Sequence, residues 1–226
     1  SILSRIGRGW DGFHIYDKAR LIQLQPGVSG GDANRHLAAF GRKIGPDPAS
    51  IDSAKIGGIL ANNSSGMCCG IEQNSYQTIE SMRLVLVDGT VVDTSDDLSV
   101  ANFRKTRADL LNGLTELRRR VMADTDLADR IQYKFKIKNT MGYSLNALVD
   151  YEDPLDIMTH LMVGSEGTLA FISNSVLRTV VEHRYKASAL ILFFNMSDAC
   201  KAIPILRSQP VAAAELMDRA SLASVE

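Results

Sequence analysis

The sequence predicts an α+β fold, in which a mixed or antiparallel sheet is flanked by helices. Segments near the N-terminus and around residues 79–94 alternate apolar and polar residues, which is typical of strands with one buried face. Between residues 96 and 135, apolar residues recur every three or four positions, which is the spacing of amphipathic helices. The chain has 226 residues, of which 45% are apolar, so it is long enough for one sizeable domain and part of a second.

A hairpin and a helix are expected first. Alternating residues predict strands near His14–Tyr16 and Arg20–Gln25, with the hairpin turn at residues 17–18. The glycines that follow lead into a helical pattern over residues 33–40, for which Asp32 is the expected N-cap.

The loop over residues 44–70 is unusually rich in glycine and small polar residues. It contains an aspartate between two prolines, a Gly57-Gly58 pair and an Asn-Asn-Ser-Ser-Gly run that ends at Gly66. Glycine lets the backbone come close to a ligand, and consecutive N–H groups in such turns form anion-binding concavities. The composition therefore favours contact with a pyrophosphate or with the polar edge of a heterocycle. A long surface connection explains this loop equally well when it is considered alone, because its glycines lack a strict spacing.

A short helix over Ala54–Ala61 is expected inside this loop, capped by Asp52 or Ser53. It would hold Gly57 and Gly58 in its interior, where each glycine costs about 1 kcal/mol relative to alanine. Close packing or close approach of a ligand is the usual reason for such a cost.

Residues 79–94 give the clearest hairpin signal of the sequence. The two strands are expected over Ile79–Val87 and Thr90–Thr94, and the Asp88-Gly89 pair between them favours a two-residue type I′ turn.

Amphipathic helices are then expected up to residue 135. Residues 112–113, Asn-Gly, are a candidate interruption, and Asp124 or Thr125 is expected to begin a second helix.

Two further polar loops follow. Residues 138–143 lead into a short helix over Ser144–Val149, and Pro154 opens a helix that extends to Leu161. Residues 164–167 place two glycines around a Ser-Glu pair and lead into an apolar strand that ends at Val181. A simple tight turn accounts for this spacing as well as a ligand-contacting turn does.

After residue 182 the pattern changes to strand, helix, strand. The strands are expected over Ala187–Phe194 and Val211–Met217, and the helix over Ser197–Leu206, capped by Ser197 or Asp198. We therefore expect a domain boundary between residues 182 and 183, and a second α+β domain that continues beyond this chain.

Charge and composition argue against several classes of protein. The net charge is −1, whereas a nucleic-acid binder would require a clustered basic excess. The basic run at residues 118–120 lies in a helical pattern and is expected to be a solvated helix face. Apolar runs fall short of the roughly 20 residues that cross a bilayer, so a cytoplasmic location is expected.

A metal site is not expected. Cys68, Cys69 and Cys200 form no CxxC or Cys/His spacing, and the four histidines are scattered without ligand spacing.

Three segments in this order resemble one known family: GPDPAS with GGILANNSSG, KNTMGYSL and GSEGTLAFIS. They resemble the PCMH-type FAD-binding domain of FAD-linked oxidases, the vanillyl-alcohol oxidase and p-cresol methylhydroxylase superfamily. Within it, they look most like the D-2-hydroxy acid dehydrogenase branch, which includes D-lactate and D-2-hydroxyglutarate dehydrogenases. The resemblance covers residues 1–182. The MCCG and RKIGPDPAS sequences look most like the long bacterial members, in which an iron–sulfur region follows the flavin half.

The resemblance implies that FAD is the cofactor and that the three segments contact it. The contacts implied by the matching motifs are Pro46, Asp47, Pro48, Ala49, Ser50, Gly57, Gly58, Asn62, Asn63, Ser65, Gly66, Asn139, Thr140, Gly142, Tyr143, Gly164, Glu166, Gly167, Thr168 and Ile172. Ala170 stands where the family usually has glycine, which weakens the case for a close ligand approach at that position.

Two family features are expected outside the chain. An RGGGTS-like phosphate loop should precede Ser1, and the histidine-rich catalytic and metal motif of the cap domain should follow Glu226. Residues 1–182 would then be most of an FAD-binding domain that is incomplete at its N-terminus, and residues 183–226 the start of a cap domain. The resemblance therefore assigns no catalytic residue to this chain, and His160 and His183 match no motif of the family. We expect a chain of this extent to bind FAD weakly or not at all, and to be inactive alone.

The resemblance implies a dehydrogenase that transfers a hydride from a small D-2-hydroxy acid to the flavin. Electrons would leave to a quinone, a cytochrome, a flavoprotein or an iron–sulfur centre, and the full-length protein is a candidate for peripheral membrane association. An alcohol or sugar oxidase that uses oxygen, a non-catalytic flavin-binding module and an α+β domain with purely structural glycine loops are the alternatives.

Overall fold

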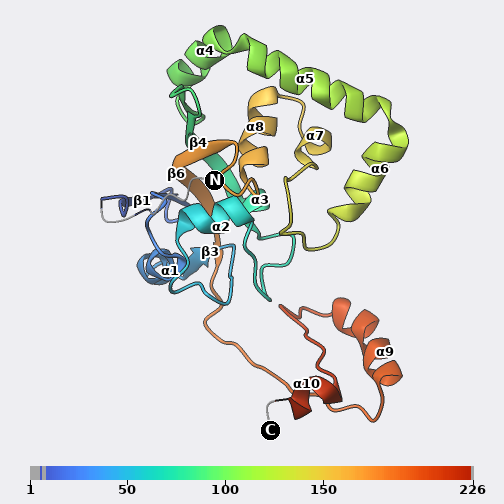
Figure 1. Cartoon of the computed structure of the whole chain (residues 1–226). Coiled ribbons are helices and arrows are strands. Elements are labelled where there is room, and N and C mark those ends of the chain that lie inside the picture. Colours follow the sequence, from blue (N-terminus) through green and yellow to red (C-terminus); the bar gives the residue numbers. More distant parts are fainter. Residues whose placement is uncertain (1–5, 7–8, 225–226) are drawn as a thin grey trace. The chain divides into compact units, whose positions relative to one another are not determined.

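The computed structural model describes residue 6 and residues 9–224, and it confirms the predicted α+β fold class (Figure 1). The chain divides into two compact units, Ser1–Glu182 and His183–Glu226. The first unit contains a sheet with its covering helices, and the described residues of the second unit, 183–224, contain two helices.

The sheet of the first unit is antiparallel throughout and is organised by its last strand. The strands are β1 (Phe13–Tyr16), β2 (Leu21–Leu24), β3 (Arg42–Ile44), β4 (Ile79–Leu86), β5 (Val91–Asp93) and β6 (Ala170–Val181). Their order is β1-β2-β6-β4-β5, and β3 pairs with the C-terminal end of β6. β6 therefore bonds to β2, β3 and β4, and it joins segments that are far apart in the sequence.

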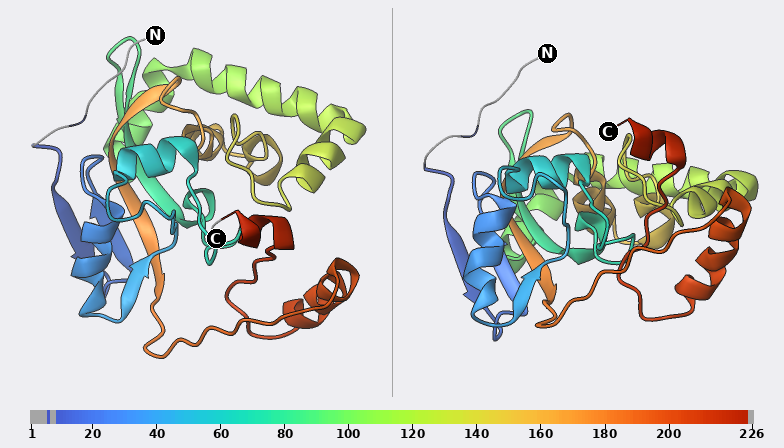
Figure 2. Two further views of the ribbon diagram at one scale, coloured as in Figure 1. Left: turned by 60° about the horizontal axis from the view of Figure 1, so that its bottom comes forward. Right: turned by 90° about the horizontal axis from the view of Figure 1, so that it is seen from below.

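The helices of the first unit pack on this sheet and on one another. They are α1 (Gly30–Ala38), α2 (Ile56–Asn62), α3 (Ser75–Thr78), α4 (Asp97–Thr106), α5 (Ala108–Ala123), α6 (Thr125–Lys134), α7 (Ala147–Asp150) and α8 (Pro154–Met162). The long α5 packs against α7 and α8, as both views of Figure 2 show. The fully buried side chains of this unit include Ile22 and Leu84 of the sheet. They also include Leu37 of α1, Phe103 of α4 and Ile157 of α8.

The first hairpin forms, but its loop contains the four residues 17–20 rather than a turn at residues 17–18 alone. Asp17, Lys18 and Ala19 all have positive φ, between 53° and 63°. The Arg20 backbone N–H donates to the Asp17 carbonyl, and the Arg20 guanidinium forms an ion pair with the Asp17 carboxylate at 2.7 Å. Both interactions close the turn.

Helix α1 begins earlier than expected, and its N-cap is Ser29, so the prediction of Asp32 was wrong. The Ser29 hydroxyl accepts the Asp32 backbone N–H at 3.0 Å and donates to the Asp32 carboxylate at 2.6 Å. The Ser29 side chain therefore satisfies an N–H of the first turn, and this cap places Gly30 and Gly31 inside that turn.

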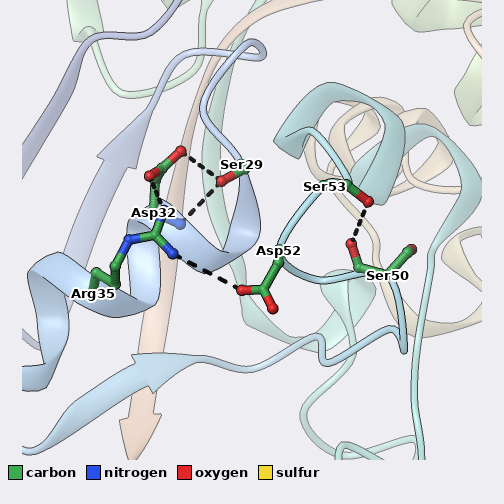
Figure 3. Close-up of polar contacts among 6 residues, drawn as sticks. All are labelled: Ser29, Asp32, Arg35, Ser50, Asp52 and Ser53. Carbon is green, nitrogen blue, oxygen red and sulfur yellow. Dashed lines mark hydrogen bonds and ion pairs between the residues drawn. The ribbon is translucent and has the colours of Figure 1, made fainter.

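Helix α2 has no side-chain cap, so the prediction of Asp52 or Ser53 was also wrong. Figure 3 shows that the Asp52 carboxylate faces Arg35, 3.9 Å away, and that the Ser53 hydroxyl donates to the Ser50 carbonyl at 3.2 Å. The first N–H groups of α2 donate instead to backbone carbonyls that precede α1: Ile56 N to Val28 O at 2.9 Å and Gly57 N to Pro26 O at 3.0 Å. These bonds satisfy donors that a capping side chain would otherwise take.

The hairpin of β4 and β5 is confirmed, but its type I′ turn is not. Gly89 has a φ of +83°, whereas Asp88 is not among the residues with positive φ. The Gly89 N–H donates to the Leu86 carbonyl at 2.9 Å, so the loop contains three residues and ends on a left-handed glycine.

The helical region differs from expectation at two points, and the first is an unpredicted break at Arg107, which separates α4 from α5. The second is that α5 runs through residues 112–113 without interruption. The predicted start of the following helix is correct, because the Asp124 carboxylate caps α6 and accepts the Leu127 N–H at 3.0 Å.

The second unit contains α9 (Met196–Arg207) and α10 (Arg219–Ala223). Asn195 caps α9, in place of the predicted Ser197 or Asp198, and its side chain accepts the Asp198 N–H at 2.9 Å. The two predicted strands were wrong, since residues 183–224 contain no strand. A strand requires a hydrogen-bonded neighbour, and Leu192 and Phe194 of the apolar run are exposed.

Within residue 6 and residues 9–224, no helix is both long and apolar enough to cross a membrane.

Candidate functional site

Two of the three polar loops meet at the C-terminal end of α2. The Leu60 carbonyl accepts the Gly164 N–H at 3.0 Å, and the Ala61 carbonyl accepts the Glu166 N–H at 2.8 Å. The Asn62 side chain donates to the Glu166 carboxylate at 2.6 Å. The loop at residues 164–167 therefore satisfies carbonyls that the last turn of α2 would leave unpaired.

Asn63 connects this junction to the loop at residues 138–143. It ends α2 in the left-handed conformation, with φ 50° and ψ 43°, which asparagine tolerates better than most residues. Its buried side chain donates to the Asn139 carbonyl at 3.4 Å and accepts the Tyr76 N–H at 3.3 Å. One side chain thus bridges α2, α3 and the second polar loop.

The second and third loops also touch each other directly. A Cβ added at Gly164, whose φ is +85°, would lie 3.1 Å from the Gly142 carbonyl. The Tyr143 and Thr168 hydroxyls are 2.8 Å apart. The structure therefore brings together predicted site residues from all three motifs: Asn62, Asn63, Asn139, Gly142, Tyr143, Gly164, Glu166 and Thr168.

Asp47 ties the start of the first polar loop to its end. Its carboxylate accepts the N–H groups of Gly66 at 2.9 Å, Cys68 at 2.9 Å and Cys69 at 3.2 Å. Burial would raise the pKa of the Asp47 carboxyl, but hydrogen bonds from the Cys69 thiol and from these N–H groups outweigh it and hold the pKa below its ordinary value. Nearby, the Lys138 ammonium lies 3.4 Å from the Gly66 carbonyl.

The glycines predicted to contact a cofactor fall into two groups. A Cβ at Gly58, Gly142 or Gly167 would meet no described atom within 4 Å, so these positions border open space. At Gly57 a Cβ would lie 2.8 Å from the Pro26 side chain, and at Gly66 it would overlap the Asp47 carbonyl. The first group leaves room for a ligand, whereas Gly57 and Gly66 are required by internal packing.

The remaining predicted residues differ in burial. Ile172 pairs with Leu84 in the sheet, and its side chain is buried in the hydrophobic core. Pro46 and Pro48 are buried, whereas Ala49 and Ser50 are exposed. Thr140 and Ser65 are half-buried beside the converging residues.

A small polar cavity of about 50 Å³ is lined in part by Asn63. Asn139, Ser144 and Asn146 contribute to its lining, and the buried Oδ1 of Asn146 has no hydrogen-bond partner among the described residues. A cavity of this size has room for a water molecule, which would supply the missing donor.

No pattern in the sequence points to Tyr76, which lines the same cavity. Its hydroxyl donates to the Asp150 carboxylate at 2.7 Å, and burial followed by this bond raises the pKa of Tyr76 above its ordinary value. A single tyrosine in a Ser-Tyr-Gln run shows no spacing from which this contact could be inferred.

His160 is a packing residue. It stacks on Tyr151 with ring centroids 3.9 Å apart, and its Nδ1 lies 2.8 Å from the Asp156 carbonyl. Burial lowers the pKa of His160 below its ordinary value. His183 is exposed at the start of the second unit.

Among the described residues, no group of three or more His, Cys, Asp and Glu residues could hold a metal ion.

The chemistry of the converging loops fits a flavin nucleotide. The potential ligand-facing groups are mostly neutral: asparagine amides, tyrosine and threonine hydroxyls, and backbone beside open glycines. Neutral donors and bare backbone are suited to a diphosphate and to the polar edge of a heterocycle. Lys138 adds one positive charge and Glu166 one negative charge.

Comparison with known proteins agrees with this fit. Residues 2–95 match the family model described as an FAD binding domain. D-2-hydroxyglutarate dehydrogenase of Haemophilus influenzae is 22% identical over 214 residues, which are 89% of this chain and 20% of the relative. D-lactate dehydrogenase [cytochrome] 1, mitochondrial, of Saccharomyces cerevisiae is 26% identical over 185 residues, which are 81% of this chain and 22% of the relative.

Among solved structures, alkyldihydroxyacetonephosphate synthase aligns with 77% of this chain and 22% of its own, at 17% identity and a TM-score of 0.43. The chain thus spans about one fifth of the length of the two sequence relatives. Residues 2–95 are therefore similar to an FAD binding domain and the chain as a whole to D-2-hydroxyglutarate and D-lactate dehydrogenases, and the predicted cofactor, FAD, is confirmed.

Proposed function

We propose that this chain is the cofactor-holding part of an FAD-dependent dehydrogenase that oxidises a small D-2-hydroxy acid, such as D-lactate or D-2-hydroxyglutarate. The observation that carries the proposal is the convergence of three polar, glycine-containing loops on the end of α2. The relatives named for these two substrates support the substrate class.

Oxidation of a 2-hydroxy acid removes the α-hydrogen and the hydroxyl proton, and the flavin supplies the hydride acceptor when it is bound. The residues of this chain would bind and orient the cofactor. Asn62, Tyr143 and Thr168 would offer hydrogen-bonding side chains, and Gly58, Gly142 and Gly167 would allow its close approach. Because His160 is packed against Tyr151 in the interior, we assign it no role in proton transfer.

Purification of the full-length protein tests the proposal directly. We expect the visible absorbance of a flavin, release of FAD on denaturation, and reduction of an artificial dye acceptor with D-lactate or D-2-hydroxyglutarate. The L enantiomers are the matched controls and should support little dye reduction. A protein without flavin would contradict the proposal, and peroxide formation without a dye would indicate an oxidase instead.

The electron acceptor and the cellular location are also proposals. We infer that electrons leave to a quinone, a cytochrome, a flavoprotein or an iron–sulfur centre, in a cytoplasmic protein that associates peripherally with the membrane. Measuring dye-free turnover with a soluble quinone or with cytochrome c, in cytosolic and membrane fractions, distinguishes these acceptors and locations.

A further inference from the structure

Both carboxylate oxygens of Asp47 are occupied by backbone N–H groups of one short segment. Oδ1 accepts from Gly66 and Cys69, and Oδ2 accepts from Cys68. Hydrogen bonds to an ionised acceptor are about twice as strong as neutral ones, so one side chain holds the entire turn over residues 66–69.

The sequence around Asp47 keeps that carboxylate in place. Pro46 and Pro48 flank it and are both buried, and a residue before proline is restricted to extended conformations. The Pro48 carbonyl also accepts the Ile51 N–H at 2.9 Å, which fixes the chain beyond the second proline. Little conformational entropy therefore remains to be lost when the carboxylate binds the turn.

The two segments that Asp47 joins are also packed backbone against backbone. A Cβ at Gly66 would overlap the Asp47 carbonyl, and a Cβ at Gly45 would overlap the Gln73 carbonyl. These two contacts show that residues 45–47 and 66–73 pack closely against each other. The Asp47 carboxylate supplies hydrogen bonds between the two segments.

We propose that Asp47 is a positioning residue for FAD, which holds the segment between Asn63 and Gly66 in its cofactor-binding shape without touching the cofactor. Asn63 fixes the other end of that segment through its left-handed conformation and its bonds to Tyr76 and Asn139. This role differs from the direct contact that the motif resemblance implied for Asp47. This assignment rests on the proposed function, because it assumes that FAD binds at these loops.

The test compares three variants of the full-length protein: Asp47→Ala, Asp47→Asn and Asp124→Asn. Asparagine keeps one acceptor oxygen and removes the negative charge, so it is the conservative variant. Asp124 is the matched control, because its carboxylate also accepts a backbone N–H, from Leu127, but caps α6 outside the three loops. The measurements are FAD affinity, by titration of the apo-protein, and amide hydrogen exchange of residues 66–69 without FAD.

We expect Asp47→Ala to weaken FAD binding at least tenfold, which is about 1.4 kcal/mol. Asp47→Asn should lie between it and the wild type, and Asp124→Asn should match the wild type. In the apo-protein, exchange at Gly66, Cys68 and Cys69 should accelerate in both Asp47 variants, a change that a direct contact with FAD alone would not produce. If the alanine variant does not fold, the asparagine variant decides by the same two measurements.

Two results would overturn the assignment. Unchanged FAD affinity in the folded Asp47 variants would reduce Asp47 to a structural residue, and unchanged amide exchange with weakened affinity would restore it as a direct contact. If the wild-type protein itself does not take up FAD, the proposed function fails and the positioning role fails with it.

Discussion

Gly58 and Gly113 offer a comparison at the scale of single residues. Each lies in a helix, α2 or α5, and at each an added Cβ would meet no described atom within 4 Å. Alanine in place of helical glycine stabilises a protein by about 0.5–1 kcal/mol. We expect both Gly58→Ala and Gly113→Ala to raise the unfolding midpoint of the apo-protein in urea.

The two substitutions should differ in their effect on FAD. A methyl group at Gly58 would occupy space that we assign to the cofactor, so Gly58→Ala should weaken FAD binding severalfold, whereas Gly113→Ala should leave it unchanged. Equal FAD affinity in both variants would show that Gly58 does not face the cofactor.

Single residues also show where sequence reasoning stops. Gly57 and Gly58 are indistinguishable as a Gly-Gly pair, yet one packs on Pro26 and the other borders open space. What a glycine faces depends on a segment elsewhere in the chain, so the motif could not separate glycines required by packing from glycines that border open space. The same limit applies to Ile172, which belongs to the right motif but points into the core.

At the scale of elements, the register of the sheet determined the length of the β4–β5 loop, against the preference of its Asp-Gly pair. Asp-Gly favours a two-residue turn, which would pair Val85 with Val92. The observed three-residue loop pairs Leu84 with Val92, and both side chains are fully buried on one face. A shift of one residue would place one of them on the opposite face, so core packing selected the longer loop.

The strands predicted after residue 182 failed for a related reason. Alternation and apolar content describe a segment that can form a strand, but pairing depends on a neighbour. Helix boundaries were better predicted where the signal is local, as at Pro154 and Asp124, than at α2, whose first N–H groups are satisfied from residues 26–28.

Helix α8 gives a prediction about pH. Burial of His160 against Tyr76 and Tyr151 lowers its pKa in the folded protein, whereas an unfolded histidine titrates near 6.5. The unfolded state therefore binds more protons as pH falls through this value, and the free energy of unfolding decreases toward the lower folded pKa. Asp150, Asp156 and Arg178 are the other charged groups that act on His160.

We expect His160→Gln to remove part of this acid sensitivity. Urea unfolding of both proteins at pH 7.5 and at pH 5.5 measures it, and the wild type should lose more stability between the two pH values. Equal losses would show that His160 is not a source of the pH dependence.

At the scale of the whole molecule, the two units differ in their cores. The first unit buries a continuous apolar cluster, whereas Ala199 is the only apolar residue of the second unit that is buried, among residues 183–224. Local opening requires less free energy where few apolar contacts are buried. Limited trypsin digestion should therefore cut first after Arg184, leaving a resistant fragment close to residues 1–182. Initial cleavage within α5 or α6 would contradict this.

The central position of β6 has a consequence for biosynthesis. β2 can pair with β6 only after residues 175–178 have been synthesised, and β4 only after residues 170–177. Leu21 therefore pairs with Arg178 only after most of the first unit has been translated. Pairing across such a separation is slow compared with local helix formation. The loop at residues 164–167, which docks on α2, immediately precedes this strand. The nascent chain should therefore acquire its FAD-binding geometry late, and cofactor loading would follow synthesis of this unit rather than accompany it.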